Sequence, residues 1–153
     1  MSKEGKLTPW KQLIYFPIDP RLLRLYATKN IAENMTWHHE HKCSPGVMSH
    51  PSDSEAWKHL NASYPDFPCE SRNARLGFCT SGFSPFGHYE QTYSFWLVIV
   101  TPYNLALWMC KKRQFKFIAL LIPGPKNSKG NLDIYMQPLI EELVQLWNEG
   151  LVT

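Results

Sequence analysis

The residues best suited to bind a metal ion gather in one short stretch. They are His38, His39, Glu40, His41, Cys43 and His50. Imidazole and thiolate are the ligands that zinc prefers, but zinc sites usually carry paired ligands at short, fixed spacings, and no pair here has such a spacing. The stretch therefore favours a solvated polar loop, with a zinc site built from His38, His39, His41 and Cys43 as the alternative.

Basic side chains gather in two later segments. They are Lys111, Lys112 and Arg113, followed by Lys126 and Lys129. Such cations can contact DNA phosphates without reading the base sequence, which makes them weak candidates for DNA binding. A solvated loop is the simpler account. Sixteen Lys and Arg against 13 Asp and Glu leave a net charge of +3, too small to indicate nucleic-acid binding by itself.

Isolated polar and aromatic residues give weaker signals. Ser81 lacks the Gly-x-Ser-x-Gly surroundings of a hydrolase nucleophile, and no base can be assigned to it. Asp133 stands at a helix start, where a carboxylate is favoured as a cap without any metal. Trp37, Trp57 and Trp96 have apolar neighbours, which favours packing in the core over stacking on nucleic-acid bases.

The cysteines and the apolar runs bear on the cellular compartment. Cys43, Cys69, Cys79 and Cys110 include no close pair, so a zinc ribbon or a redox motif is not indicated and a reduced, intracellular chain is favoured. The first residues contain no apolar leader, and the apolar run at 117–123 is too short to cross a bilayer. We therefore expect neither secretion nor membrane insertion.

The elements that must position these residues change in type near Arg72. Before it, helix-start signals predict three short helices, beginning at Asp19–Pro20, at Thr28 and after the capping-box spacing of Ser52–Glu55. The first should be capped by Asp19 and bury Leu22, Leu23 and Tyr26. The third should end near Asn61, because prolines at 65 and 68 disfavour helical geometry in the residues before them.

After Arg72 the pattern predicts three strands and a helix. The strands are Arg75–Thr80, closed by a Gly- and Pro-bearing loop at 81–87, then Tyr93–Thr101 and Phe115–Ile122. The middle strand is β-branched and continuous, which is typical of a strand covered on both faces, and its short connection to the third favours an antiparallel pair.

Beyond a loop at 123–131, apolar residues recur at three and four positions and predict an amphipathic helix ending near Gly150. Pro138 leaves two starts open, at Asp133 with a bend or near Gln137.

Eight short strings stand in the order found in plant CACTA-type (En/Spm) transposases. They are YFP at 15–17, RLLRLY at 21–26, HPSD and AWKH at 50–59, RLG at 75–77, GFSPFG at 82–87, VIVTPYNL at 98–105, PGPK at 123–126 and QPLIEEL at 137–143. From about Tyr15 to Gly150, the sequence resembles the N-terminal part of the catalytic region of these enzymes.

The resemblance implies a fold and a metal chemistry. The fold is α/β, as an α+β-like fragment: a helical preface and then β-β-β-α, the first half of a ribonuclease-H-like fold. In this family three acids hold two Mg or Mn ions that activate the attacking group and stabilise the oxygen leaving a DNA phosphodiester. The first acid stands in a Thr-Asp-Gly-Phe string, and this chain has Ser81 at that position. A hydroxyl cannot offset the charge of two dications as a carboxylate does. Glu90 is the nearest acid downstream, but it lies nine residues further across a loop and is not expected to replace this ligand. The other two family acids would follow Thr153.

We therefore expect a truncated, catalytically inactive transposase-derived protein that uses no cofactor. Its parts are an N-terminal extension at 1–14, a helical preface at 15–71 and an incomplete ribonuclease-H-like domain at 72–153. One alternative is a non-catalytic module retained from a transposon that binds DNA or a full-length relative, with self-association through the open edge of Arg75–Thr80. A His-rich metal-binding module is a third hypothesis. The chain should be nuclear or cytoplasmic, and the nucleus follows from the resemblance alone.

Overall fold

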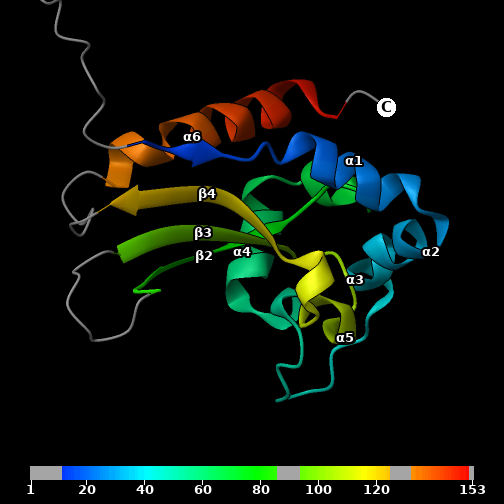
Figure 1. Cartoon of the computed structure of the whole chain (residues 1–153). Coiled ribbons are helices and arrows are strands. Elements are labelled where there is room, and N and C mark those ends of the chain that lie inside the picture. The colour runs from blue at the N-terminus through cyan, green and yellow to red at the C-terminus, as the bar shows by residue number, and fades with distance from the viewer. Residues whose placement is uncertain (1–11, 86–93, 125–131, 152–153) are drawn as a thin grey trace, which may run out of the picture.

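A computed structural model describes residues 12–85, 94–124 and 132–151 (Figure 1). The four strands form one sheet in the order β1-β4-β3-β2, and every neighbouring pair is antiparallel. Their bounds are Ile14–Tyr15 for β1, Leu76–Phe83 for β2, Ser94–Pro102 for β3 and Phe117–Gly124 for β4. Helices and antiparallel strands together make the described chain an α+β structure.

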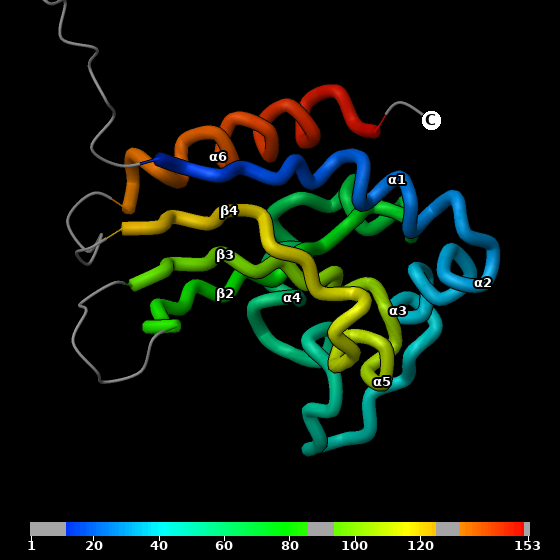
Figure 2. The backbone as a smooth tube through the Cα atoms, viewed as in Figure 1, coloured from blue at the N-terminus to red at the C-terminus, as the bar shows by residue number. Residues whose placement is uncertain are grey.

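Six helices accompany the sheet in the described part of the chain. They are α1 (Asp19–Ala27), α2 (Lys29–Ala32), α3 (Trp37–Glu40), α4 (Glu55–Ser63), α5 (Leu107–Cys110) and α6 (Leu132–Glu149), with 3₁₀ turns at Glu33–Thr36, Pro51–Asp53, Phe67–Cys69 and Arg113–Phe115. Figures 1 and 2 show α6 beside β1 and the start of α1, while α2, α3 and α5 gather beyond one end of the strands. No described helix has the length and apolar character needed to cross a membrane.

The three strands predicted from the sequence are present, but the predicted end of the first is wrong. Strand β2 continues through Phe83, where a loop was expected from Ser81. The reason is pairing: Ser81, Gly82 and Phe83 each have a register partner on β3, so ladder hydrogen bonds outweigh the turn preference of these residues. The two-residue strand β1 was not predicted, because a pair of residues carries no periodic signal.

The helix-start predictions need three corrections. The cap position of α1 is Ile18 and not Asp19, and the buried face includes Leu25 in place of Leu23. Helix α4 is capped by Ser54, which accepts the backbone N–H of Trp57 at 3.3 Å. Helix α6 already begins at Leu132, so the later of the two predicted starts is wrong and Pro138 lies inside the helix.

The missing cap of α1 is supplied by a residue far along the chain. Glu142 on α6 accepts the backbone N–H of Ile18 at 2.9 Å and that of Asp19 at 3.0 Å, and it also accepts the hydroxyl of Tyr15. Burial and the nearby Glu142 carboxylate raise the pKa of Tyr15, so its hydroxyl stays a donor. One carboxylate thus joins α6, β1 and the start of α1.

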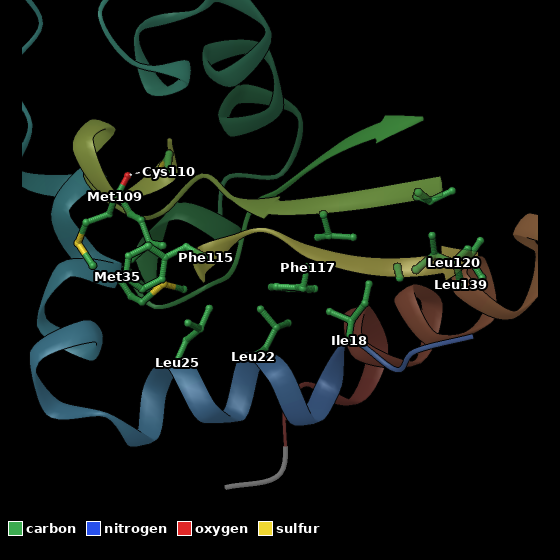
Figure 3. Close-up of a cluster of buried hydrophobic side chains, with 14 of the residues drawn as sticks. Ile18, Leu22, Leu25, Met35, Met109, Cys110, Phe115, Phe117, Leu120 and Leu139 are labelled. Atoms are coloured by element: carbon green, nitrogen blue, oxygen red, sulfur yellow. Dashed lines mark hydrogen bonds between the residues drawn. The ribbon is translucent and has the colours of Figure 1, made fainter. Parts of the chain in front are cut away.

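The core lies between one face of the sheet and helices α1 and α6. Figure 3 shows Ile18 and Leu22 directed toward Phe117 on β4, Leu25 directed toward Phe115 and Met35, and Leu139 of α6 beside Leu120. All of these side chains are buried. The cluster draws on residues from both sides of position 72, and the division of the chain into a preface and a domain at that position stays a prediction.

Burial in the sheet is one-sided within the described residues. Val98 and Val100 of β3 are buried in the core, whereas Leu97 and Ile99 between them are only partly buried. Successive side chains of a strand point to opposite faces, so Leu97 and Ile99 lie on the face away from the core. The expectation that β3 is covered on both faces is therefore not met here.

Candidate functional site

Ser81, at the position where the family resemblance implies an acid, lies on an edge strand. It is exposed and stands opposite Leu97 of β3. Cross-strand partners share a sheet face, so Ser81 lies with Leu97 on the face away from the core. The position offers one exposed hydroxyl.

The acids of a two-metal centre are not assembled by the residues that the structure describes. Within residues 12–85, 94–124 and 132–151, no group of three or more His, Cys, Asp or Glu side chains is placed to hold a metal ion. Asp133, weighed as a ligand, is an exposed residue in the first turn of α6, and Glu90 lies outside the described residues. A pair of Mg or Mn ions therefore does not fit the described side chains.

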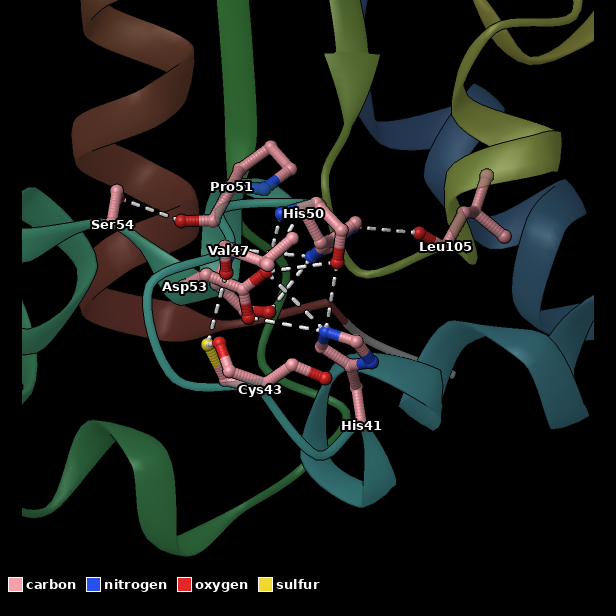
Figure 4. A network of polar contacts seen from close by, with 11 residues as sticks. His41, Cys43, Val47, His50, Pro51, Asp53, Ser54 and Leu105 are labelled. Carbon is pink, nitrogen blue, oxygen red and sulfur yellow. Dashed lines mark hydrogen bonds and ion pairs between the residues drawn. The ribbon is translucent and has the colours of Figure 1, made fainter.

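The histidine-rich stretch forms a compact network around Asp53 (Figure 4). Asp53 Oδ2 accepts the backbone N–H groups of Ser49 and His50 at 2.9 Å, and its Oδ1 lies 3.1 Å from His41 Nε2. Only 3% of this side chain is exposed. Burial alone would raise the pKa of Asp53, but the donors together hold it well below its usual range, so the carboxylate stays ionised.

The histidines in this network make structural bonds. The backbone N–H of Ser52 donates to His50 Nδ1, which leaves Nε2–H to donate to the carbonyl of Leu105 at 3.1 Å. Burial lowers the pKa of His50, consistent with a neutral ring. His41 stacks on Trp37 with ring centroids 4.4 Å apart. The network ties the 41–53 segment to the connection between β3 and α5.

The remaining zinc candidates do not converge. His38 Nδ1 lies 3.4 Å from the carbonyl of Asn104, His39 is exposed, and Cys43 Sγ contacts the carbonyl of Val47 at 3.3 Å. The predicted zinc site of His38, His39, His41 and Cys43 thus finds no support in the geometry of the described residues.

The basic candidates are separated from Ser81. Lys111, Lys112 and Arg113 are exposed and follow α5, beyond the Pro102 end of β3. Ser81 pairs with Leu97, nearer the other end of that strand. Lys126 and Lys129 lie outside the described residues, so a continuous basic strip stays a prediction.

Sequence reasoning missed the most unusual charged residue of the described chain, Arg75. It is 8% exposed, and its guanidinium carbon lies 4.0 Å from the ring centroid of Trp57 and 5.1 Å from that of Phe67. Its Nη2 donates to Asn61 Oδ1. Only the short RLG string marked this position, because burial of an arginine depends on elements distant in sequence.

A buried amide fixes the backbone on either side of Arg75. Asn104 is fully buried, its Oδ1 accepts the backbone N–H of Arg75 at 2.6 Å, and its Nδ2 donates to the carbonyl of Asn73 at 2.9 Å. The carbonyl of Arg75 accepts the backbone N–H of Tyr103 at 2.7 Å. The start of β2 is thereby locked to the end of β3.

The aromatic candidates for base stacking are partly buried. Trp57 covers Arg75, Trp37 packs against His41, and Trp96 lies over Gly82, where an added Cβ would come within 2.9 Å of its ring. All three side chains are packed against protein groups, as the sequence favoured.

Comparison with known proteins gives one match. Residues 45–153 match the family described as Transposase family tnp2. The matched range contains α4, β2, β3, β4 and α6, together with Ser81 and Arg75. Neither the curated proteins nor the solved structures gave a significant match.

Proposed function

The chain belongs to the transposase family tnp2, and from this membership we propose that it derives from a plant CACTA-type (En/Spm) transposase and does not cleave DNA by itself. The ordered sequence strings support the narrower CACTA assignment. The serine at position 81 and the scattered placement of the described acids support the loss of activity.

The proposal extends to the fold. Strands β4, β3 and β2 are antiparallel neighbours, and the helix that follows them in the chain, α6, packs on β4. This arrangement supports a correspondence with the first half of a ribonuclease-H-like domain, in which β2 would be the strand that carries the first acid.

The observation that carries the functional proposal is the chemistry of position 81. Two divalent ions need charged oxygen ligands at close range, because neutral hydroxyls neither offset their charge nor bridge them. Ser81 supplies one exposed hydroxyl, and no three His, Cys, Asp or Glu side chains of the described ranges are grouped to make up for it.

A nicking assay tests the loss of activity. Purified protein incubated with Mn²⁺ and supercoiled plasmid should release no more nicked circles than buffer with Mn²⁺ does. Ser81→Asp should not restore nicking, since one carboxylate does not hold two ions. Metal-dependent nicking that is lost in Ser81→Ala and retained in Thr80→Ala, a matched change at the adjacent strand residue, would contradict the proposal.

A second candidate function, a protein-binding module, is favoured by the outer edge of β2. Among the described residues this strand pairs only with β3, and its eight residues include neither a charge nor a proline. Phe78 and Phe83 are 43% and 45% exposed. An edge without charge or proline is a template for strand addition by another chain, such as a full-length relative or a second copy.

Sedimentation at increasing protein concentration tests the binding module. We expect concentration-dependent association that Thr80→Lys reverses, because a lysine on an edge strand disfavours pairing. Gln114→Lys adds the same charge at an exposed site away from β2 and should leave association unchanged. A wild-type chain that stays monomeric at every salt and protein concentration would contradict this candidate.

A further inference from the structure

Arg75 is a buried cation without an anionic partner among the residues described. Ion pairs in residues 12–85, 94–124 and 132–151 join His41 to Asp53, Lys58 to Glu55, and Arg72 to Glu70, and none includes Arg75. Its Nη1 is buried and has no hydrogen-bond partner in this part of the chain. An arginine side chain stays charged in proteins, so the positive charge must be offset in another way.

The packing contacts of Arg75 hold its side chain in place but do not offset its positive charge. The rings of Trp57 and Phe67 stabilise the guanidinium through cation–π contacts, and Asn61 Oδ1 accepts a hydrogen bond from Nη2. These contacts hold the side chain in place, but none of them carries negative charge. A structural role therefore explains the orientation of Arg75 and leaves its charge unmatched.

A cavity of about 260 Å³ adjoins this charge. Arg75, Trp57 and Asn61 line it together with Lys58, Asp53 and Glu70. Its volume lies below the roughly 300–1,000 Å³ of pockets that enclose a whole small-molecule ligand. The cavity is therefore suited to one chemical group of a ligand.

The two carboxylates of the cavity wall already accept hydrogen bonds from other protein groups. Asp53 accepts donors from Ser49, His50 and His41, and Glu70 accepts both Nε and Nη2 of Arg72 at 3.0 Å. The side-chain bond from Arg72 lowers the pKa of Glu70 to about 2. Both carboxylates are held by donors of their own and neither pairs with Arg75, so the Arg75 guanidinium favours an additional anion.

We propose that the cavity beside Arg75 binds a phosphate group. A guanidinium presents planar N–H groups that match phosphate oxygens, and the Lys58 ammonium, which pairs with Glu55 at 2.7 Å, also lines the cavity. Nη1 is covered by protein, so a phosphate oxygen can reach it only if the guanidinium shifts against the rings of Trp57 and Phe67. The phosphate can belong to a DNA strand, which rests on the proposed transposase descent, or to a free phosphorylated molecule, which does not.

An NMR titration of the 153-residue chain with inorganic phosphate tests the site. We expect saturable shifts of the Arg75 Nε–H and the Trp57 indole N–H signals, because the Arg75 guanidinium lies over the Trp57 ring at the cavity wall. Sodium chloride at matched ionic strength should not reproduce them. Shifts that fail to saturate, or that chloride produces equally, would overturn the proposal without any variant being needed.

Variants locate the binding. In Arg75→Lys and Arg75→Met we expect phosphate affinity about tenfold to a hundredfold weaker, the loss typical of charge-assisted hydrogen bonds. Arg24→Met is the matched control, since Arg24 is exposed on α1 and does not line the cavity, and it should bind phosphate as the wild type does. If both Arg75 variants fail to fold, Lys58→Met should weaken binding at the exposed side of the cavity. Wild-type affinity in folded Arg75 variants would overturn the proposal.

Short oligonucleotides separate the two sources. A single-stranded oligonucleotide with a 5′ phosphate that binds more tightly than its unphosphorylated form, and that inorganic phosphate displaces, identifies DNA as the source. Binding of inorganic phosphate and of a nucleoside monophosphate, without binding of either oligonucleotide, identifies a free molecule. Absence of all binding overturns the phosphate site and leaves the result of the plasmid assay unaffected, so the two proposals fail separately.

Discussion

The two edges of the sheet are built in opposite ways. At one edge, β1 has only two residues in the ladder, and the chain that follows it is held by the Glu142 carboxylate of α6. At the other edge, β2 presents eight residues without charge or proline, and most of them are exposed. A short strand covered by a helix offers little to a partner, whereas a long bare strand offers a full row of backbone groups.

The difference indicates which side of the molecule can take part in association. The β1 edge is closed by contacts within the chain, so changes there should act on stability. The β2 edge is open among the described residues, so changes at its exposed side chains should act on association and leave stability nearly unchanged. The predictions below test this contrast, from the largest expected effect to the smallest.

Removing the Glu142 carboxylate should open the closed edge. Glu142→Ala leaves the N–H groups of Ile18 and Asp19 and the Tyr15 hydroxyl without their acceptor. Loss of a helix cap together with unsatisfied, partly buried donors should lower the free energy of unfolding by about 3 kcal/mol, measured by urea denaturation.

The neighbouring Glu141 is the matched control. It is exposed and bonds to Gln137 one turn away, so Glu141→Ala should change the free energy of unfolding by about 0.5 kcal/mol or less. Equal losses in the two variants would show that the contact of α6 with the start of α1 does not stabilise this edge.

Gly77 lies on β2, but a change at this position should affect stability, because the residue packs closely against the ring of Tyr103. A Cβ added there would lie 2.0 Å from the ring of Tyr103, so Gly77→Ala must displace that ring. We expect a loss of about 2 kcal/mol in the free energy of unfolding, as for other overpacked sites. Thermal and urea unfolding would measure it.

A double-mutant cycle tests whether the Tyr103 ring causes the expected loss at Gly77. In a Tyr103→Ala background, Gly77→Ala should cost much less, and the double-mutant cycle should give a coupling that accounts for most of the loss. Additive effects of the two changes would mean that the ring does not restrict position 77.

Acid should weaken the contact between His38 and Asn104, which lies in the β3–α5 connection. Burial, together with smaller effects of Arg75, His39 and His50, outweighs the opposing bond to Asn104 and lowers the pKa of His38 from 6.5 to about 4. The unfolded chain then binds more protons than the folded chain between these two pH values. Stability is therefore full above about pH 6.5 and falls as the pH drops toward 4.

Urea unfolding at a series of pH values would measure this loss. The Asp53 carboxylate has its pKa held below its usual range, so it should stay ionised throughout this window and contribute little to the change. His38→Gln should flatten the dependence, and an unchanged slope in that variant would assign it to other groups.

The smallest effect is expected at position 81. Ser81 is exposed on the edge strand, so Ser81→Ala should change the free energy of unfolding by about 0.5 kcal/mol or less. A larger loss in urea denaturation would show that the hydroxyl makes a contact that stabilises the fold and would weaken the contrast between the two edges.

Local sequence patterns predicted the regular elements well. The β-branched run at β3 and the three- and four-residue spacing of α6 each reflect contacts that one element makes along its whole length. The family assignment likewise rested on short strings in order, and the match over residues 45–153 confirms it at the level of the transposase family.

Contacts between distant residues could not be predicted in this way. Glu142 replaces Asp19 in binding the start of α1, although 123 positions separate the two. Arg75 is buried because α4 supplies Trp57 and a 3₁₀ turn supplies Phe67. Neither partner is marked by spacing or composition, because each depends on how the whole chain packs.

The bond from Glu142 to Ile18 also sets an order of events during synthesis. A ribosome makes Glu142 124 residues after Ile18, so α1 has no Glu142 acceptor until the segment that carries α6 has emerged. Contacts this distant in sequence form late, because closing a long loop costs chain entropy before any contact is gained. The β1 side of the sheet is therefore completed after translation of α6, while the β2–β3 hairpin can form on the nascent chain.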